Sequence, residues 1–427
     1  MAKKPVTAII LGAGHRSMTY GEYSLEHPDE LKIVGVAELD EYRRNIVKNK
    51  FGIPDDKCFV SAEALAAAPK FADVVINGTM DEQHVETSVP LLERGYDMLL
   101  EKPFAVNETE MNVLVDTVKK HGNKVMICHV LRYTPFYRTI KENIINGTIG
   151  DIINIQTVEN ISYDHITTSY VRGKWADINK CRTTMLLAKC CHDIDIMAWL
   201  MGADKPVSVS SVGSLMQFKP ENAPEGAGTR CLVDCPHVDS CRYSAKRIYL
   251  QHPESWQCYV WQAIENIENP TEEDRIATLK ENDYGRCVYK CGNNVCDHQS
   301  VLVNFASGAT GTHNVTGGAV RSLRTIRVTG TKGDIYGEFE KNLITLRVIN
   351  PAPDKYHDET VIDLSHVGTE GHGGGDENLM KDFIKFARGE DVSVSCTSIY
   401  DSVAGHKIIF RADESREKDG ALVRIDL

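Results

Sequence analysis

The stretch TAIILGAGHRSMTYGEY, residues 7–23, decides the fold of the first part of the chain. An apolar run of strand length leads into Gly12 and Gly14, and the segment that follows can form a helix. In such a unit the first glycine permits a tight turn, and the second lets backbone amides approach a pyrophosphate at the positive helix N-terminus. Ser17 stands where a third glycine normally serves helix–strand packing. The predicted cofactor-binding residues of this turn are Gly12, Gly14, His15, Arg16 and Ser17.

A second apolar run, LKIVGVAELD at residues 31–40, ends in acidic residues. Glu38 lies roughly 20 residues beyond the glycine turn, where a carboxylate meets the adenosine ribose hydroxyls of NAD. The nearby Arg43 is able to accept the 2′-phosphate of NADP instead. We therefore expect NAD as the cofactor, with NADP as the alternative.

Strands and helices continue to alternate beyond this point. Buried strands are predicted over residues 72–80 and 96–103, with a helix over residues 82–95 between them. This repetition produces a parallel sheet, and ligands of such sheets bind at the carboxyl ends of the strands. The side chains expected to face one crevice there are Thr79, His84, Glu101 and Lys102.

The glycine turn, the acid at Glu38 and the segment LLEKPFAVN, residues 99–107, together resemble the glucose–fructose oxidoreductase and inositol dehydrogenase family (Gfo/Idh/MocA). The resemblance implies that Lys102 lies beside the nicotinamide and the substrate hydroxyl and is catalytic. The local chemistry agrees, because an ammonium that is partly desolvated in a cleft can have its pKa lowered towards the working range.

The same resemblance implies two domains, of α/β and α+β class. We expect residues 1–127 to form a Rossmann domain with a doubly wound parallel sheet. Residues 128–427 are expected to form a substrate and oligomerisation domain, whose strand-like segments between turns fit an open, mostly antiparallel sheet with helices on one face. The resemblance also implies that the other face of the sheet is used for oligomer contacts, so we expect a homodimer or homotetramer. Sedimentation as a monomer would contradict this expectation.

Residues 185–202, MLLAKCCHDIDIMAWLMG, have apolar residues at helical spacing and are predicted to form one helix. Neighbouring cysteines on a helix diverge, so Cys190 and Cys191 are expected to pack rather than to share a metal. The family carries a histidine in this helix, which makes His192 a second catalytic candidate, able to accept the hydroxyl proton. The aspartate that the family commonly has four residues earlier is Ala188 here, so either Lys189, Asp193 or Asp195 takes over part of its role, or His192 is a weaker base. The sequence leaves open whether Lys102 or His192 takes the proton.

Two polar segments, residues 162–175 and 370–390, are expected to reach the substrate, because the family places comparable loops there. Their side chains suit hydrogen bonding to a sugar or stacking on it. The predicted substrate-binding residues are His165, Arg172, Trp175, Lys189, Asp193, His372 and Asp376.

Residues 218–299 form a cysteine-rich insertion with many turns and few aliphatic runs. Such a segment buries little core, and a metal bound by thiolates can supply the missing folding energy. The expected ligands are Cys231, Cys235, Cys241 and Cys287, with Cys291 as the alternative to the last. The spacing of these residues favours structural zinc over an iron–sulfur cluster, and reduced cysteines without metal remain an alternative.

Composition excludes some classes of partner. The net charge of -12 disfavours nucleic acid, because phosphate binding needs a concentrated basic surface. No apolar run approaches the ~18 residues that span a bilayer, and the first residues run straight into a strand, so we expect a cytoplasmic protein.

The sequence therefore predicts an NAD-dependent dehydrogenase that oxidises a secondary hydroxyl of a sugar, glycoside or cyclitol, with C3 of a glycoside preferred. Relatives suggest two alternatives. One is NAD-dependent glycoside cleavage through a transient keto-sugar, and the other is a non-catalytic regulator that binds dinucleotide.

Overall fold

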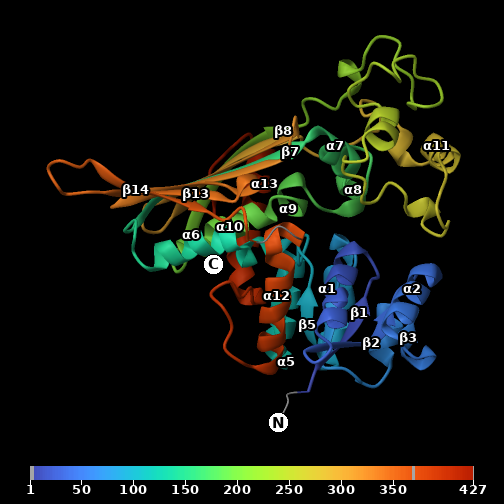
Figure 1. The fold of residues 1–427 in the computed structure, drawn as a ribbon, viewed down its shortest axis with the longest axis horizontal. Coiled ribbons are helices and arrows are strands. Elements are labelled where there is room, and N and C mark those ends of the chain that lie inside the picture. The colour runs from blue at the N-terminus through green and yellow to red at the C-terminus, as the bar shows by residue number, and fades with distance from the viewer. Residues whose placement is uncertain (1–3, 368–370, 427) are drawn as a thin grey trace.

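The computed structural model describes residues 4–367 and 371–426 and contains two sheets. The first sheet has six parallel strands in the order β3-β2-β1-β4-β5-β6 (Figure 1). Its strands are β1 (Val6–Leu11), β2 (Leu31–Ala37), β3 (Cys58–Phe59), β4 (Val74–Asn77), β5 (Asp97–Leu100) and β6 (Val125–Ile127). This order reverses between β1 and β4, which is the point where doubly wound sheets bind dinucleotides.

Helices cover both faces of this sheet, so its strands are apolar runs rather than alternating ones. Ile9, Ile10 and Val75 are completely buried. The helices that follow the strands are α1 (His15–Glu26), α2 (Glu41–Phe51), α3 (Ala62–Ala67), α4 (His84–Glu93) and α5 (Glu108–His121). A helix from near the end of the chain, α12 (Gly371–Arg388), also packs here, with Leu379 and Phe383 in the same apolar cluster as β1. The structure thus brings residues 371–388 to the dinucleotide domain.

The second sheet has nine strands in the order β14-β13-β12-β11-β7-β10-β9-β8-β15, and all neighbours except β7 and β10 are antiparallel. Its strands are β7 (Ile152–Ser162), β8 (Pro206–Ser214), β9 (His298–Phe305), β10 (Thr310–Ala319), β11 (Leu323–Gly330), β12 (Gly333–Glu338), β13 (Leu343–Ile349), β14 (His357–Asp363) and β15 (Val423–Arg424). The sequence-based prediction of a parallel sheet followed by a mostly antiparallel one is confirmed.

Helices pack against this sheet from the side of the first domain (Figure 1). They include α6 (Pro135–Ile145), α10 (Cys191–Met201) and α13 (Ile399–Glu417). The short helices between β7 and β8 are α7 (Tyr163–Ile166), the π-helical turn η4 (Thr167–Val171), α8 (Ile178–Cys181) and α9 (Met185–Ala188). Among the described residues, no helix combines the length and the apolar character needed to cross a membrane.

Between β8 and β9 the chain forms a projection with little regular structure, which contains α11 (Glu272–Glu281) and lies beyond the sheet near α7 and α8 (Figure 1). It has a small apolar cluster of its own, which includes Ile248, Tyr249 and Leu279. We call residues 215–297 the insertion. Its loop reaches back to the first domain, where Tyr42 donates a hydrogen bond to the carbonyl of Glu265.

Candidate active site

The turn after β1 has a backbone that only glycine suits. Gly12 has a φ of +76°, and a Cβ there would lie 3.0 Å from the amide nitrogen of Thr79. Gly14 is the N-cap of α1 and provides no side chain to satisfy the first amides of that helix. These amides therefore remain free to bind an anion, as a pyrophosphate requires. The turn fits the dinucleotide that its sequence predicts.

Ser17 is tolerated at the third glycine position because its neighbour in space is itself a glycine. Ser17 is fully buried, and a Cβ on Gly78 would lie 2.2 Å from the Ser17 hydroxyl oxygen. Because Gly78, the residue after β4, has no side chain, the Ser17 side chain on α1 fits beside it. This compensation explains how the dinucleotide turn keeps its close packing without the third glycine.

Glu38 lies just beyond β2 and faces the glycine turn. One carboxylate oxygen accepts a hydrogen bond from the amide of Ala13 at 2.5 Å, and the other accepts one from the amide of Asp40 at 2.9 Å. Arg43 points elsewhere, because its guanidinium forms an ion pair with Glu265 of the insertion at 2.7 Å. In this structure Arg43 is therefore not directed at the place where a 2′-phosphate would lie. The acid that suits ribose hydroxyls is present, whereas the arginine that suits a 2′-phosphate is engaged.

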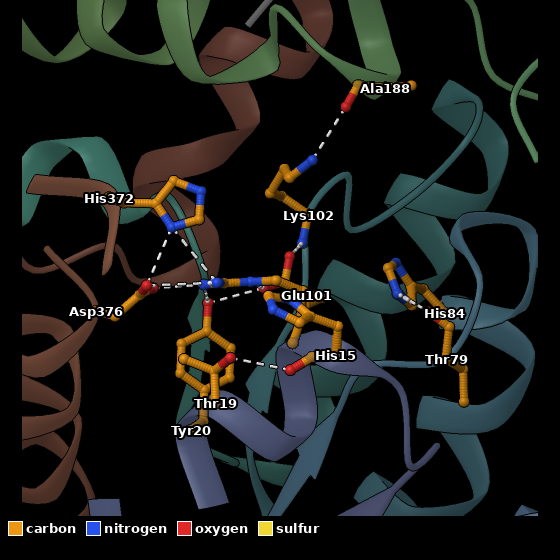
Figure 2. A network of polar contacts seen from close by, with 11 residues as sticks. His15, Thr19, Tyr20, Thr79, His84, Glu101, Lys102, Ala188, His372 and Asp376 are labelled. Carbon is orange, nitrogen blue, oxygen red and sulfur yellow. Dashed lines mark hydrogen bonds and ion pairs between the residues drawn. The ribbon is translucent and has the colours of Figure 1, made fainter. Parts of the chain in front are cut away.

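The ends of β4 and β5 meet at His84. Its Nδ1 lies 2.7 Å from the carbonyl oxygen of Pro103. Its Nε2 lies 3.1 Å from the carbonyl oxygen of Thr79 (Figure 2). The imidazole thus links the turn after β4 to the turn that carries Lys102. His84 is 1% exposed, and we infer that it positions these two turns relative to each other.

Glu101 belongs to a buried polar network that also includes Tyr20, Asp376 and His372 (Figure 2) and is linked through Arg16. Glu101 accepts hydrogen bonds from Arg16 Nε at 3.0 Å and from the Tyr20 hydroxyl at 2.7 Å. Arg16 also pairs with Asp376 at 2.5 Å, and Asp376 in turn contacts His372 at 3.0 Å. Burial alone would raise the pKa of Glu101, but Arg16, Lys102 and the Tyr20 hydroxyl outweigh it and lower that pKa. The network holds the start of α12 against the dinucleotide turn.

Lys102 extends from this network towards the second domain. Its amide donates to Glu101 at 3.0 Å, and its Nζ donates to the carbonyl oxygen of Ala188 at 3.0 Å (Figure 2). Burial alone would lower the pKa of Lys102, but Cys191, Glu101 and Asp81 outweigh burial and raise that pKa. The expectation of a lowered lysine pKa is therefore wrong. The neighbouring acids keep Lys102 an ammonium.

Asp81 is a residue of this region that the sequence analysis did not select. It is 7% exposed, and its carboxylate accepts a hydrogen bond from the indole of Trp175 at 2.8 Å. Desolvation raises the pKa of Asp81, while Lys102 is the strongest influence in the opposite direction. Asp81 thus supplies a carboxylate near Lys102, whereas position 188, where an aspartate was the expected neighbour of the catalytic pair, is alanine. The sequence signal that could have identified Asp81 is its position just beyond the end of β4, where ligands of parallel sheets bind.

The segment around His192 is two helices rather than one. The first, α9, ends at Ala188, and α10 begins at Cys191, so Lys189 and Cys190 form a break between them. The prediction of one continuous helix is wrong here. The break turns the carbonyl of Ala188 towards Lys102 and leaves Lys189 free to point differently from α10. Cys190 and Cys191 are buried within the apolar core.

His192 lies in the first turn of α10 and is 8% exposed. Its Nδ1 is buried without a hydrogen-bond partner among the described residues. Burial, followed by the charge of Lys102 and the neighbouring His129, lowers the pKa of His192 well below its usual value of 6.5. The imidazole is therefore neutral at pH 7 and can accept a proton.

A cluster of charges lies behind this helix. Glu159 of β7 pairs with Arg324 of β11 and with Lys189, whose Nζ is 3.5 Å away. Asp193 also pairs with Arg324, at 3.2 Å. Lys189 and Arg324 reach the cavity, whereas Asp193 lies behind them, which corrects its assignment as a substrate contact. Burial lowers the pKa of Lys189, and Glu159 opposes this.

Aromatic side chains form the wall opposite the dinucleotide turn. His165 stacks on Trp256 of the insertion with ring centres 4.3 Å apart, and Trp175 meets Tyr259 edge-on at 5.6 Å. Arg172, which was expected here, instead points into the insertion, where it donates to the carbonyls of Arg286 and Tyr243. The assignment of Arg172 to substrate binding is thus corrected. The insertion contributes two rings to this wall that its sequence gave no reason to place there.

These groups enclose one cavity of about 210 Å³ between the two domains. Of the residues predicted from the sequence, it is lined by Gly14, His15, Arg16, Thr79, His84, Glu101, Lys102, His165, Trp175, Lys189, His192 and His372. Gly12, Ser17 and Glu38 support the turn beside it, and Asp376 holds Arg16 from outside. The residues that the sequence analysis missed include Asp81, Tyr170, Lys174 and Arg324. Four cysteines of the insertion, Cys231, Cys235, Cys241 and Cys287, line a separate, smaller space.

Two family profiles match the chain in succession. The profile described as the NAD-binding Rossmann fold of the Gfo/Idh/MocA oxidoreductase family matches residues 6–129. The profile of the C-terminal alpha/beta domain of the same family matches residues 141–390.

Individual relatives agree with these matches. The putative oxidoreductase YteT of Bacillus subtilis is 25% identical over 374 residues, which are 82% of this chain and 81% of that protein. The trans-1,2-dihydrobenzene-1,2-diol dehydrogenase of Mus musculus is 29% identical over 187 residues, or 44% of this chain and 53% of the mouse enzyme. The chain thus matches about half the length of that relative.

A solved structure of levoglucosan dehydrogenase with NADH and levoglucosan superimposes on the chain with a TM-score of 0.71. The two share 18% identity, and the superposition covers 99% of this chain and 100% of the other. At this identity the likeness shows a common fold.

Proposed function

Since the chain belongs to the Gfo/Idh/MocA family of NAD(P)-dependent oxidoreductases, we propose that it oxidises a secondary hydroxyl group of a sugar, glycoside or cyclitol with NAD. C3 of a glycoside is the preferred position. The observation that carries the proposal is the meeting of the Lys102 ammonium and the neutral His192 imidazole in one cavity beside the dinucleotide turn. An alcohol that loses a hydride needs a group that takes its proton and a group that stabilises its oxygen.

The Rossmann domain binds NAD, which when bound accepts the hydride. The choice of NAD over NADP is part of the proposal and rests on Glu38, whose two carboxylate oxygens suit the two ribose hydroxyls. Arg43 remains paired with Glu265, and it would have to leave that ion pair to meet a 2′-phosphate.

The pKa directions support one division of the two proton roles. His192, whose pKa lies well below 6.5, accepts the hydroxyl proton. Lys102, whose pKa is raised, donates a hydrogen bond to the same oxygen and stabilises its developing negative charge. Its present partner, the carbonyl of Ala188, is neutral and holds the ammonium across the cavity until the hydroxyl replaces it.

The walls of the cavity suit a ring with hydroxyl groups. Lys189, His372 and Arg16 offer hydrogen-bonding groups on two sides, and the rings of Trp256 and Tyr259 offer flat apolar surfaces. Sugars and cyclitols combine polar edges with C–H faces that stack on aromatic rings. A levoglucosan dehydrogenase and a dihydrodiol dehydrogenase among the similar proteins support a cyclic alcohol as substrate.

Replacing Glu38 by alanine should weaken NADH binding by about 10-fold or more, because hydrogen bonds to a charged acceptor contribute ~1.5–3 kcal/mol each. NADPH binding should change less, since its 2′-phosphate is repelled by the same carboxylate. Fluorescence titration with both nucleotides measures the two affinities. Glu41→Ala, three residues further along the chain on the exposed start of α2, is the matched control. Equal losses for both nucleotides, or no loss for NADH, would contradict the assignment of Glu38.

The function itself is tested with a panel of sugars, cyclitols and glycosides, in which absorbance follows NADH and mass spectrometry follows products. The proposal expects NADH and a ketone in equal amounts with at least one member. A cleaved glycoside with no net NADH would support the transient keto-sugar reaction instead. Tight NAD binding without any product across the panel would favour a regulator and overturn the proposal.

A further inference from the structure

Four cysteines of the insertion surround one small enclosed space. Cys231, Cys235, Cys241 and Cys287 all line it, and all four are free thiols. The space measures about 10 Å³, which holds a single atom of the size of a water oxygen. We propose that these four sulfurs bind one structural zinc ion. The proposal stands independently of the dehydrogenase function.

A backbone amide points at one of these sulfurs. The amide of Tyr243, two residues after Cys241, donates a hydrogen bond to Cys241 Sγ at 3.4 Å. An amide donor in this position suits a sulfur that carries negative charge, as a zinc ligand does.

Arg172 is a second and independent indication of negative charge at this place. It is 3% exposed, its Nη2 lies 3.7 Å from Cys231 Sγ, and it lines the same space. In the described part of the chain its hydrogen bonds go to two backbone carbonyls and to Cys231 Sγ rather than to a carboxylate, and its Nη1 has no hydrogen-bond partner there. A buried guanidinium without an anion is costly. Four thiolates around Zn²⁺ carry a net charge of about -2, and this charge would provide the missing anion.

Cys291 is not among the proposed ligands. Its sulfur donates to the carbonyl of Cys287 at 3.0 Å, and it lines a different hollow on the surface of the insertion. His237 does line the space, but its Nε2 is held by the carbonyl of Glu225 at 2.7 Å. The structure therefore favours Cys287 over Cys291 as the fourth ligand.

Another group of donors in the described chain, Cys190, Asp193 and His313, has its ligand atoms within 4.8 Å of one another. A cation is not needed there, because Arg324 already pairs with Asp193. The four sulfurs of the insertion do not form such a tight group, so we expect them to contract around the ion to Zn–S distances of about 2.3 Å.

The spacing of the cysteines along the chain fits no iron–sulfur pattern closely and therefore favours zinc. An ion would add to the stability of the insertion, which buries a small apolar cluster around Ile248, Tyr249 and Leu279 and packs further side chains, such as Phe218 and Val288, into the core of the second domain. Zinc bonding supplies folding energy to modules of this kind. The ion would also fix Arg172, which directly follows the turn whose Ser169 and Tyr170 line the main cavity.

The test is elemental analysis of the full chain, purified without added metal under reducing conditions. We expect about one zinc per chain, as a closed four-thiolate site requires. Replacement by Co²⁺ should give sulfur-to-cobalt charge-transfer absorption and tetrahedral d–d bands. Cys235→Ser and Cys287→Ser should lose at least about half of the metal, whereas Cys258→Ser and Cys291→Ser, in the same insertion, should keep it.

Failure of the serine variants to fold would not weaken the test, because the zinc and cobalt measurements use the unchanged chain. Absence of zinc, together with failure of the chain to compete for Zn²⁺ with a chelator of micromolar affinity, would overturn the proposal. Iron and acid-labile sulfide in equal amounts would overturn it as well. Retention of metal in both Cys235→Ser and Cys287→Ser would place the ion elsewhere.

Discussion

Replacing Lys102 by alanine should lower kcat by about 10³-fold, because removal of one preorganised donor to a developing oxyanion costs roughly 10²–10³ and this donor is also a full charge. Lys102 is the ammonium that reaches across the cavity from the turn after β5 to the carbonyl of Ala188. NADH affinity should change by less than about threefold, since the loss falls on the transition state rather than on ground-state binding. Steady-state kinetics with a substrate found by the panel, and NADH titration, measure the two quantities.

Two controls distinguish a chemical role of Lys102 from a structural one. Lys32→Ala removes an exposed lysine of β2 and should leave kcat unchanged. Added methylamine should restore part of the activity of Lys102→Ala, because it supplies an ammonium to the vacated space. Asp81→Asn should lower the alkaline pKa of the rate profile, since Asp81 is one of the acids that raise the pKa of Lys102. Full turnover by Lys102→Ala would show that the proposed mechanism is wrong.

Replacing His192 by asparagine should lower kcat by about 10²–10⁴-fold, the usual range for loss of a positioned general base. The pH profile gives a sharper test. Because burial lowers the pKa of His192 well below 6.5, the unchanged enzyme should keep its kcat/KM from pH 6.5 upwards and lose it only as pH falls through that lowered pKa. In His192→Asn this acid limb should disappear.

His121→Asn is the matched control, because His121 is an exposed residue at the end of α5, which lies in the first domain. Its kinetics and its pH profile should match those of the unchanged chain. An acid limb centred at or above pH 6.5, or one that persists in His192→Asn, would exclude His192 as the proton acceptor.

The sequence predicts the features that depend on local pattern. The apolar runs at β1, β2, β4 and β5 are readable because a parallel sheet buries both faces of its strands. Gly12 is readable because its φ of +76° suits glycine. Lys102 and His192 followed from a family resemblance, and the structure places both in one cavity.

The features that the sequence did not predict depend on contacts distant in the chain. Arg43 and Arg172 are of a residue type that often binds ligands. In the structure Arg43 instead pairs with Glu265, and Arg172 donates hydrogen bonds to backbone carbonyls of the insertion. The break after Ala188 is invisible to helical periodicity, because the apolar pattern continues across it. The direction of the Lys102 pKa depends first on Cys191 and then on Glu101 and Asp81, and two of these three residues are distant from the lysine in sequence.

Deuterium transfer tests the central claim most directly. The unchanged chain is incubated with NAD and a glycoside that carries deuterium at the oxidised carbon, and the nucleotide is then examined by mass spectrometry. The account predicts NADH that carries one deuterium, formed together with the ketone. Substrate consumption with unlabelled NADH, or bound NAD that never acquires label from any member of the panel, would contradict it.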